Sequence, residues 1–138
     1  MRYLNNLVKD GTHMCFGCSD KNPIGLKLKF KLDGDICRSE FTAGDQHQGW
    51  NGYMHGGLIA SLLDETMAWW LWLRDIPIMT AEMTTRYSLG VPVNTKLVLE
   101  SWCESEKKGR LFDMAGRLLL PDGKVAVKAR AKFMKVDL

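Results

Sequence analysis

A single carboxylate inside an apolar helix is the first candidate for chemistry in this sequence. From Gly56 to Leu73 most positions are apolar, which predicts a buried helix. Small or polar residues recur at i, i+4, i+7 and i+11 and form one stripe on it: Gly57, Ser61, Asp64 and Ala68. A carboxylate in such surroundings costs free energy unless partners or a reaction offset it. Asp64 is therefore either a hydrogen-bonded structural acid or an acid–base group, and the stripe leaves both open.

His55-Gly56-Gly57 stands where a polar loop meets this helix. The first amides of a helix have no internal acceptor, so Gly56 and Gly57 could offer N–H groups to an oxyanion. Glycine also lets an acyl carbonyl approach closely. The alternative is that the paired glycines serve only a sharp turn into the helix.

The spacing of His55 and Asp64 implies a second copy of the chain. They are nine residues apart, which separates them by roughly 13 Å along the helix and places them on opposite faces. One chain cannot bring both to one reacting centre. A shared site therefore predicts a symmetric dimer with two composite sites. Glu65, turned about 100° from Asp64, is expected to be solvated or at an interface.

Strands must hold this helix in place. Leu26 to Leu32 alternates apolar residues with lysine, Asp33-Gly34 predicts a hairpin, and Ile36 to Phe41 reads as the returning strand. Four more strands are predicted after the helix: Thr80 to Ser88, Thr95 to Ser105, Arg110 to Leu120, and Val125 to Phe133. Short turns imply antiparallel neighbours, and a helix apolar nearly all round must be covered. The sequence predicts an α+β hotdog fold, with a curled antiparallel sheet of five to six strands around one long helix.

Length and charge limit the classes of function. The 138 residues fit one domain, spanning 1–138 with 1–25 as a lead-in segment. A net charge of +3, without basic residues interleaved with aromatics, gives no reason to expect a nucleic-acid partner. Met1 to Asp10 lacks a signal-peptide pattern, and polar residues interrupt Leu58 to Leu73, so neither export nor a membrane span is expected. We expect a cytoplasmic protein.

The four cysteines are expected to be reduced thiols: Cys15, Cys18, Cys37 and Cys103. Cys15-x-x-Cys18 could be half of a zinc site or a redox pair, but no second close pair accompanies it. Two packed thiols are the favoured interpretation, with no metal and no cofactor.

At this point the residues resemble a known family. His55-Gly-Gly-Leu-Ile-Ala-Ser-Leu-Leu-Asp64 resembles the helix signature of PaaI-like hotdog acyl-CoA thioesterases, within the 4-hydroxybenzoyl-CoA thioesterase superfamily. Cys15-Phe-Gly-Cys18 followed by Asn22-Pro-Ile-Gly-Leu-Lys-Leu-Lys-Phe30 is similar to the lead-in of many members. The resemblance covers about Cys15 to Phe133. It implies an enzyme that hydrolyses an acyl-CoA thioester to free acid and CoA, as a homodimer or a dimer of dimers.

The resemblance also implies roles for single residues. Asp64 would act as general base or nucleophile, and the Gly56 amide of the partner subunit would polarise the thioester carbonyl. His55 would support the carbonyl site, and Thr80 would help to hold the water or the acyl group. Many members carry Asn six residues before this His, where this chain has Gly49. Further substrate contacts are expected at Gly57 and Ser61, and at Gln48 or Asn51 in place of that Asn.

Two segments are implied to bind CoA. The first consists of Tyr87, Ser88, Leu89, Gly90, Val91 and Pro92, and the second is the turn Lys107, Lys108, Gly109 and Arg110. A basic turn suits the phosphates of CoA. The alternative for that turn is a solvated hairpin end.

The sequence leaves open the role of three clustered tryptophans and the choice between an enzyme and a binding module. Trp69, Trp70 and Trp72 cannot all face one way, and we hypothesise that they narrow the acyl cavity. A non-catalytic hotdog module that binds acyl-CoA would share fold, dimer and pocket with the enzyme and differ at Asp64. A hydratase is the weaker alternative, because its usual Asp/His pairing on the helix is not seen.

Overall fold

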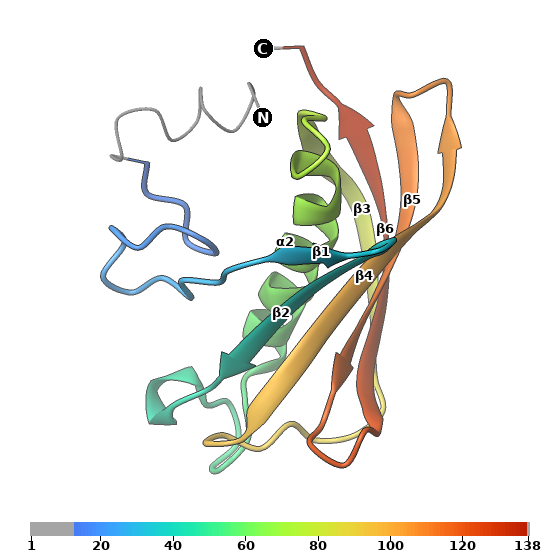
Figure 1. The fold of residues 1–138 in the computed structure, drawn as a ribbon. Helices are drawn as coiled ribbons and strands as arrows, with labels where there is room; N and C mark the ends of the chain where they lie inside the picture. Colours follow the sequence, from blue (N-terminus) through green and yellow to red (C-terminus); the bar gives the residue numbers. More distant parts are fainter. Residues whose placement is uncertain (1–12, 138) are drawn as a thin grey trace.

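One long helix lies against a curled antiparallel sheet (Figure 1). The structure is a computed structural model and describes residues 13–137. The strands run in the order β1-β2-β4-β5-β6-β3, which confirms the predicted hotdog fold with six strands in the described part of the chain. The elements are β1 (Lys31–Asp33), β2 (Ile36–Thr42), the 3-10 turn η1 (Asp45–His47), α2 (Gly56–Trp72), β3 (Ile78–Tyr87), β4 (Lys96–Lys107), β5 (Leu111–Leu119) and β6 (Val125–Lys135).

The core lies between α2 and the inner face of the sheet. From the helix it takes Ile59, Leu62, Leu63, Met67, Ala68 and Leu71, all buried. From the sheet it takes large side chains that include Leu97, Leu99, Phe112, Leu118 and Phe133. The alternation of these strand residues with polar ones directs one face inward, as the sequence pattern predicts.

The strand predicted for Leu26 to Leu32 is only partly present, because β1 begins at Lys31. Lys27 has a φ of 55°, which breaks the extended backbone. Leu26 and Leu28 are still buried, but their amides donate to the carbonyls of Phe16 and Gly17 rather than to a neighbouring strand. The alternation thus corresponds to burial at Leu26 and Leu28 but not at Leu32, which is exposed, and the strand prediction is wrong before Lys31.

The tryptophans join the end of α2 to the β1–β2 hairpin and the segment before it. Trp69 stacks on Phe30 with 5.2 Å between ring centroids, and Trp72 meets Trp69 edge-on at 5.6 Å. The Trp70 indole donates to the Asp35 carbonyl at 2.8 Å. These contacts are structural packing, and selection of the acyl group by the tryptophans stays a prediction.

β3 is an edge strand of the sheet, with β6 on one side. Most of its residues are exposed, and among them Met79 and Tyr87 are large and 63% and 49% exposed. An exposed edge offers unpaired backbone groups to another strand. Among the described residues, β3 therefore has no strand neighbour on the side away from β6.

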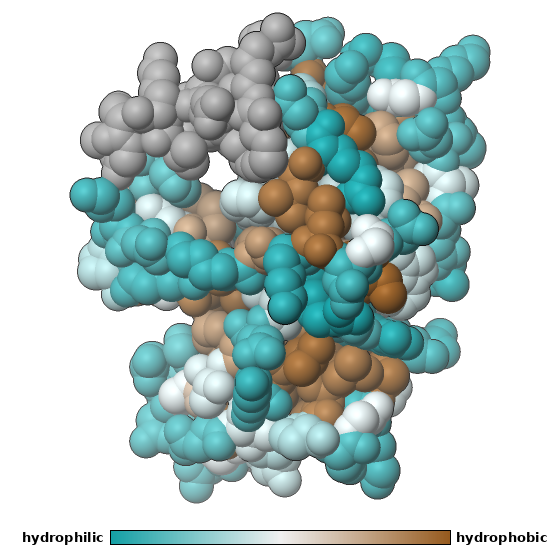
Figure 2. Space-filling view, in the orientation of Figure 1, coloured by the Kyte–Doolittle hydropathy of each residue, from teal (hydrophilic) through white to brown (hydrophobic). Residues whose placement is uncertain are grey.

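The surface is mixed rather than uniformly polar. In the face seen in Figure 2, apolar patches lie between hydrophilic side chains. Within residues 13–137, none of the helices has the length and hydropathy needed to cross a bilayer. The cytoplasmic location stays a prediction.

Candidate active site

The Asp64 carboxylate lies half-buried midway along α2 and meets the start of β3. Thr80 Oγ1 donates to Asp64 Oδ1 at 2.7 Å. A register shift between Thr80 and Glu82 interrupts the β3–β6 ladder at this point, and such irregularities re-aim side chains. Burial raises the pKa of Asp64, and the hydrogen bond from Thr80 offsets part of that rise.

The start of α2 keeps one backbone amide free. His55 is the N-cap, and its Nδ1 accepts from the Gly57 amide at 2.9 Å. The amides of Leu58 and Ile59 donate to the His55 carbonyl. Gly56 N–H has no acceptor among the described residues, so Gly56 rather than Gly57 can offer an N–H to an oxyanion. A neutral His55 whose Nδ1 accepts carries its proton on Nε2.

A groove of about 690 Å³ opens at this end of the helix. Gly56 and Asn51 line it, together with most of the first predicted CoA segment: Tyr87, Ser88, Leu89, Gly90 and Val91. Tyr87 also donates its hydroxyl to the Gly56 carbonyl at 2.7 Å. Pro92 forms a β-bridge with Tyr53, which is another groove residue. The segment predicted to bind CoA and the free Gly56 amide thus lie in one groove.

Gln48 and Asn51, the two residues expected in place of the Asn that many family members carry, have different surroundings in the loop before α2. The Gln48 side chain accepts from the Gly52 amide and donates to the Asp45 carbonyl, so it is engaged within the loop. Asn51 faces the groove. A Cβ at Gly49 would lie 3.2 Å from His55 Cα, closer than a side chain usually approaches. The tight contact with His55 is a physical reason for glycine at position 49.

Within one chain, the predicted site residues fall into two groups. Gly56 and Asp64 are eight residues apart on α2, about 12 Å along its axis. Ser61, between them, donates its hydroxyl back to the Gly57 carbonyl at 3.1 Å. Asp64 is hydrogen-bonded to Thr80 near the start of β3. Gly56 is hydrogen-bonded to Tyr87 at the end of β3.

The second predicted CoA segment, Lys107 to Arg110, lies at the Asp64 end. The Lys135 amide donates to the Arg110 carbonyl, and Lys135 pairs with Ile78 at the start of β3. At the other end of β3, Tyr87 pairs with Val127 of β6. Val127 precedes Lys135 by eight residues, which is about 26 Å along the strand. The two segments predicted to bind CoA are therefore at opposite ends of the sheet within one chain.

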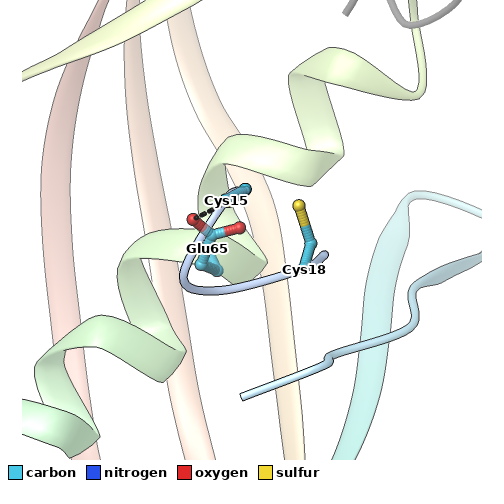
Figure 3. A group of neighbouring side chains, drawn as sticks. All are labelled: Cys15, Cys18 and Glu65. Atoms are coloured by element: carbon cyan, nitrogen blue, oxygen red, sulfur yellow. Dashed lines mark hydrogen bonds between the residues drawn. The ribbon is translucent and has the colours of Figure 1, made fainter. Parts of the chain in front are cut away.

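A second cluster of reactive side chains was missed by the sequence prediction. Cys15 donates to Glu65 Oε1 at 3.6 Å, and Cys18 lies beside them (Figure 3). The expectation of a solvated or interface Glu65 is wrong, because the segment before β1 covers this face of α2. Burial, followed by the neighbouring Cys15 and Asp64 charges, raises the pKa of Glu65 to about 8. The Cys-x-x-Cys pair was the available signal, but its nearness to residue 65 depends on the tertiary path of the chain.

Comparison with known proteins gives a consistent result. The family model described as the thioesterase superfamily matches residues 51–130. Acyl-coenzyme A thioesterase THEM4 of Rattus norvegicus is 28% identical over 97 residues, which cover 70% of this chain and 42% of that protein. The chain thus matches less than half the length of this curated relative.

Solved structures share the fold. A crystal structure of a thioesterase superfamily protein has a TM-score of 0.79 at 26% identity and covers 91% of this chain and 66% of that chain. The E. coli PaaI protein from the phenylacetic acid degradation operon has a TM-score of 0.75 at 15% identity, covering 81% of each chain. A Streptococcus mutans protein bound to acetyl-CoA has a TM-score of 0.73 at 13% identity, covering 79% of this chain and 88% of that one.

Proposed function

Because this chain belongs to the thioesterase superfamily, we propose that it hydrolyses the thioester of an acyl-CoA to the free acid and CoA. The observation that carries the proposal is the half-buried Asp64 carboxylate, held by Thr80 on an otherwise apolar helix. The name of the THEM4 relative and the acetyl-CoA bound to a protein of the same fold support the choice of substrate class.

The proposed chemistry uses Asp64 and Gly56. Asp64 takes a proton from water, and the resulting hydroxide attacks the thioester carbonyl. The Gly56 N–H donates to the oxyanion that forms, and CoA leaves as the thiolate. His55 caps the helix start, which fixes the direction of that amide. Direct attack by the Asp64 carboxylate, giving an anhydride that water then hydrolyses, is the other route.

A symmetric dimer through β3 would join the separated groups. Two antiparallel β3 strands related by a two-fold axis between Met83 and Thr84 set Thr80 opposite the partner's Tyr87. Asp64 hydrogen-bonds with Thr80 and Gly56 with Tyr87, so the same register brings Asp64 toward the partner's Gly56. It also brings the Lys107 to Arg110 turn toward the partner's first CoA segment. We therefore propose two composite sites per homodimer; a dimer of dimers stays a prediction.

The test is CoA release, measured with a thiol reagent over a panel of acyl-CoAs. We expect Asp64→Asn to lower kcat by at least about 100-fold. Gly56→Pro removes the amide hydrogen at a helix position that tolerates proline, so it should lower kcat by about 100- to 1,000-fold. Gly56→Ala is the matched control, since it keeps the N–H and its Cβ would lie 3.6 Å from the Tyr87 ring.

Three results would contradict the proposal. One is an Asp64→Asn variant as active as wild type. Another is a Gly56→Ala variant that loses as much activity as Gly56→Pro. The third is binding of acyl-CoA with no hydrolysis anywhere on the panel, which would favour the non-catalytic module. After a single turnover in H₂¹⁸O, ¹⁸O found in Asp64 identifies direct attack, since the general-base route places the label only in the acid product.

A further inference from the structure

We propose that Cys15, Cys18 and Glu65 supply three of the ligands of a zinc ion. The site is separate from the proposed reaction and does not depend on it. The three side chains come from two segments, the turn at residues 15–18 and the middle of α2, and Figure 3 shows them converging. Two thiolates and a carboxylate are ligands that Zn²⁺ accepts.

The distances suit a metal ion. One ligand atom from each side chain lies within 4.8 Å of the other two. A point between three such atoms is at most about 2.8 Å from each, and Zn²⁺ needs about 2.0–2.3 Å. Small side-chain rotations would close this difference.

Hydrogen bonds and close packing hold the turn that carries the two cysteines in place. The Ser19 amide donates to the Cys15 carbonyl at 3.0 Å, and the Ser19 hydroxyl donates to the His13 carbonyl at 2.6 Å. These bonds fix the backbone of the turn and with it the positions of the two cysteines. A Cβ at Gly17 would lie 2.2 Å from Glu65 Cδ, so a larger residue at position 17 would displace the Glu65 side chain. Position 17 is thus fitted closely to Glu65.

Within residues 13–137, the cluster has no ion-pair partner. Glu65 Oε2 is buried and has no hydrogen-bond partner among the described residues. No described Lys, Arg or His forms an ion pair with Glu65. A buried carboxylate oxygen normally has a partner. A cation between the sulfurs and Glu65 would supply both the missing partner and the missing charge.

Zinc binding to the metal-stripped, reduced protein tests the proposal. We expect the wild type to bind one Zn²⁺ per chain in competition with a chromophoric chelator. Co²⁺ used as a probe should show a sulfur-to-cobalt charge-transfer band. Cys15→Ser and Cys18→Ser should each weaken binding by more than about 100-fold, and Glu65→Gln by at least about tenfold. Cys103→Ser is the matched control, because Cys103 donates to the Ser105 carbonyl and lies outside the cluster; it should bind zinc like wild type.

Thermal unfolding gives a second readout. Because a ligand that binds only the folded state stabilises it, Zn²⁺ should raise the Tm of wild type and Cys103→Ser but not of Cys15→Ser. A reduced wild-type protein that takes up no Zn²⁺ would overturn the proposal, including one that only forms a Cys15–Cys18 disulfide when the reductant is removed. Equal loss of binding in Cys103→Ser would overturn it as well.

Discussion

The hydrogen bond from Thr80 fixes one oxygen of the Asp64 carboxylate and leaves the other available. Asp64 has partly lost contact with water through burial, and this raises its pKa. A carboxylate whose pKa moves toward neutral pH is a stronger proton acceptor than an exposed one. Position and basicity at residue 64 are therefore both set by its neighbours on α2 and β3.

Removing the Thr80 hydroxyl should slow hydrolysis without unfolding the protein. Thr80 is exposed, so Thr80→Val changes little packing. We expect kcat/KM to fall by about tenfold, the equivalent of one hydrogen bond to a charged group. Thr80→Ser keeps the hydroxyl and should retain most of the activity. Wild-type activity in Thr80→Val, or a loss in Thr80→Ser as large as that in Thr80→Val, would contradict the assignment to the hydrogen bond.

At the scale of the elements, Glu100 ties three neighbouring strands together. It lies on β4 directly between Arg38 of β2 and Arg117 of β5. Arg38 Nε donates to it at 2.7 Å and Arg117 Nε at 2.9 Å. Burial alone would raise the pKa of Glu100, but the two arginines outweigh it and hold the pKa below its ordinary value. The ionised form of Glu100 thus stabilises the fold.

This arrangement predicts a loss of stability in acid. A depressed carboxyl pKa gives stability that is present above the unfolded pKa and is lost as pH falls through the folded value. We expect Glu100→Gln to lower the free energy of unfolding at pH 7 by about 1.5–3 kcal/mol. Its difference from wild type should shrink below about pH 4.5, where the unfolded carboxyl is protonated.

Urea unfolding between pH 7 and pH 3 measures this effect. The control is Glu40→Gln, whose ion pair with Lys96 spans 3.1 Å between exposed side chains. That change should cost less than about 1 kcal/mol. A Glu100→Gln difference that stayed constant over the whole pH range would contradict the assignment to the Glu100 charge.

The stacked rings of Phe30 and Trp69 join the segment before β1 to the end of α2. Trp69→Ala should lower the free energy of unfolding by about 3–5 kcal/mol. A double-mutant cycle with Phe30→Ala should give a coupling of about 0.5–1.5 kcal/mol. Trp50→Ala is the control, because Trp50 is 86% exposed and should change stability by less than about 0.5 kcal/mol. A coupling near zero would mean that the rings are adjacent without stabilising each other.

The spacing of apolar residues in the sequence predicted the long helix and the strands after it correctly. Helix α2 starts at Gly56 as expected, and the strands after it are within a few residues of the prediction. The error at Leu26 to Leu32 arose because alternation reports burial, whereas a strand also needs a neighbour for its amides. The Asp64 and Thr80 pair followed from the family resemblance. The nearness of Cys15 to Glu65 could not be predicted, since it depends on where the chain before β1 folds back.

At the scale of the whole molecule, one chain holds the parts of the proposed site at two ends. Asp64, Thr80 and the Lys107 to Arg110 turn lie at one end of the sheet. Gly56 and the groove lie at the other. Under the β3 register proposed above, each composite site takes one end from each chain. Activity is then a property of the pair, and two different inactive chains should complement each other.

Mixed dimers of Asp64→Asn and Gly56→Pro chains test this directly. In such a dimer one site carries both changes, while the other combines an intact Asp64 with an intact Gly56. Random mixing makes half of the dimers mixed, so co-expressed chains should regain about a quarter of the wild-type kcat per site. Each variant alone should stay inactive, and two Asp64→Asn chains carrying different tags control for mixing itself. If Asp64 and Gly56 of the same chain formed the site, every chain would carry a lesion and mixing would restore no activity.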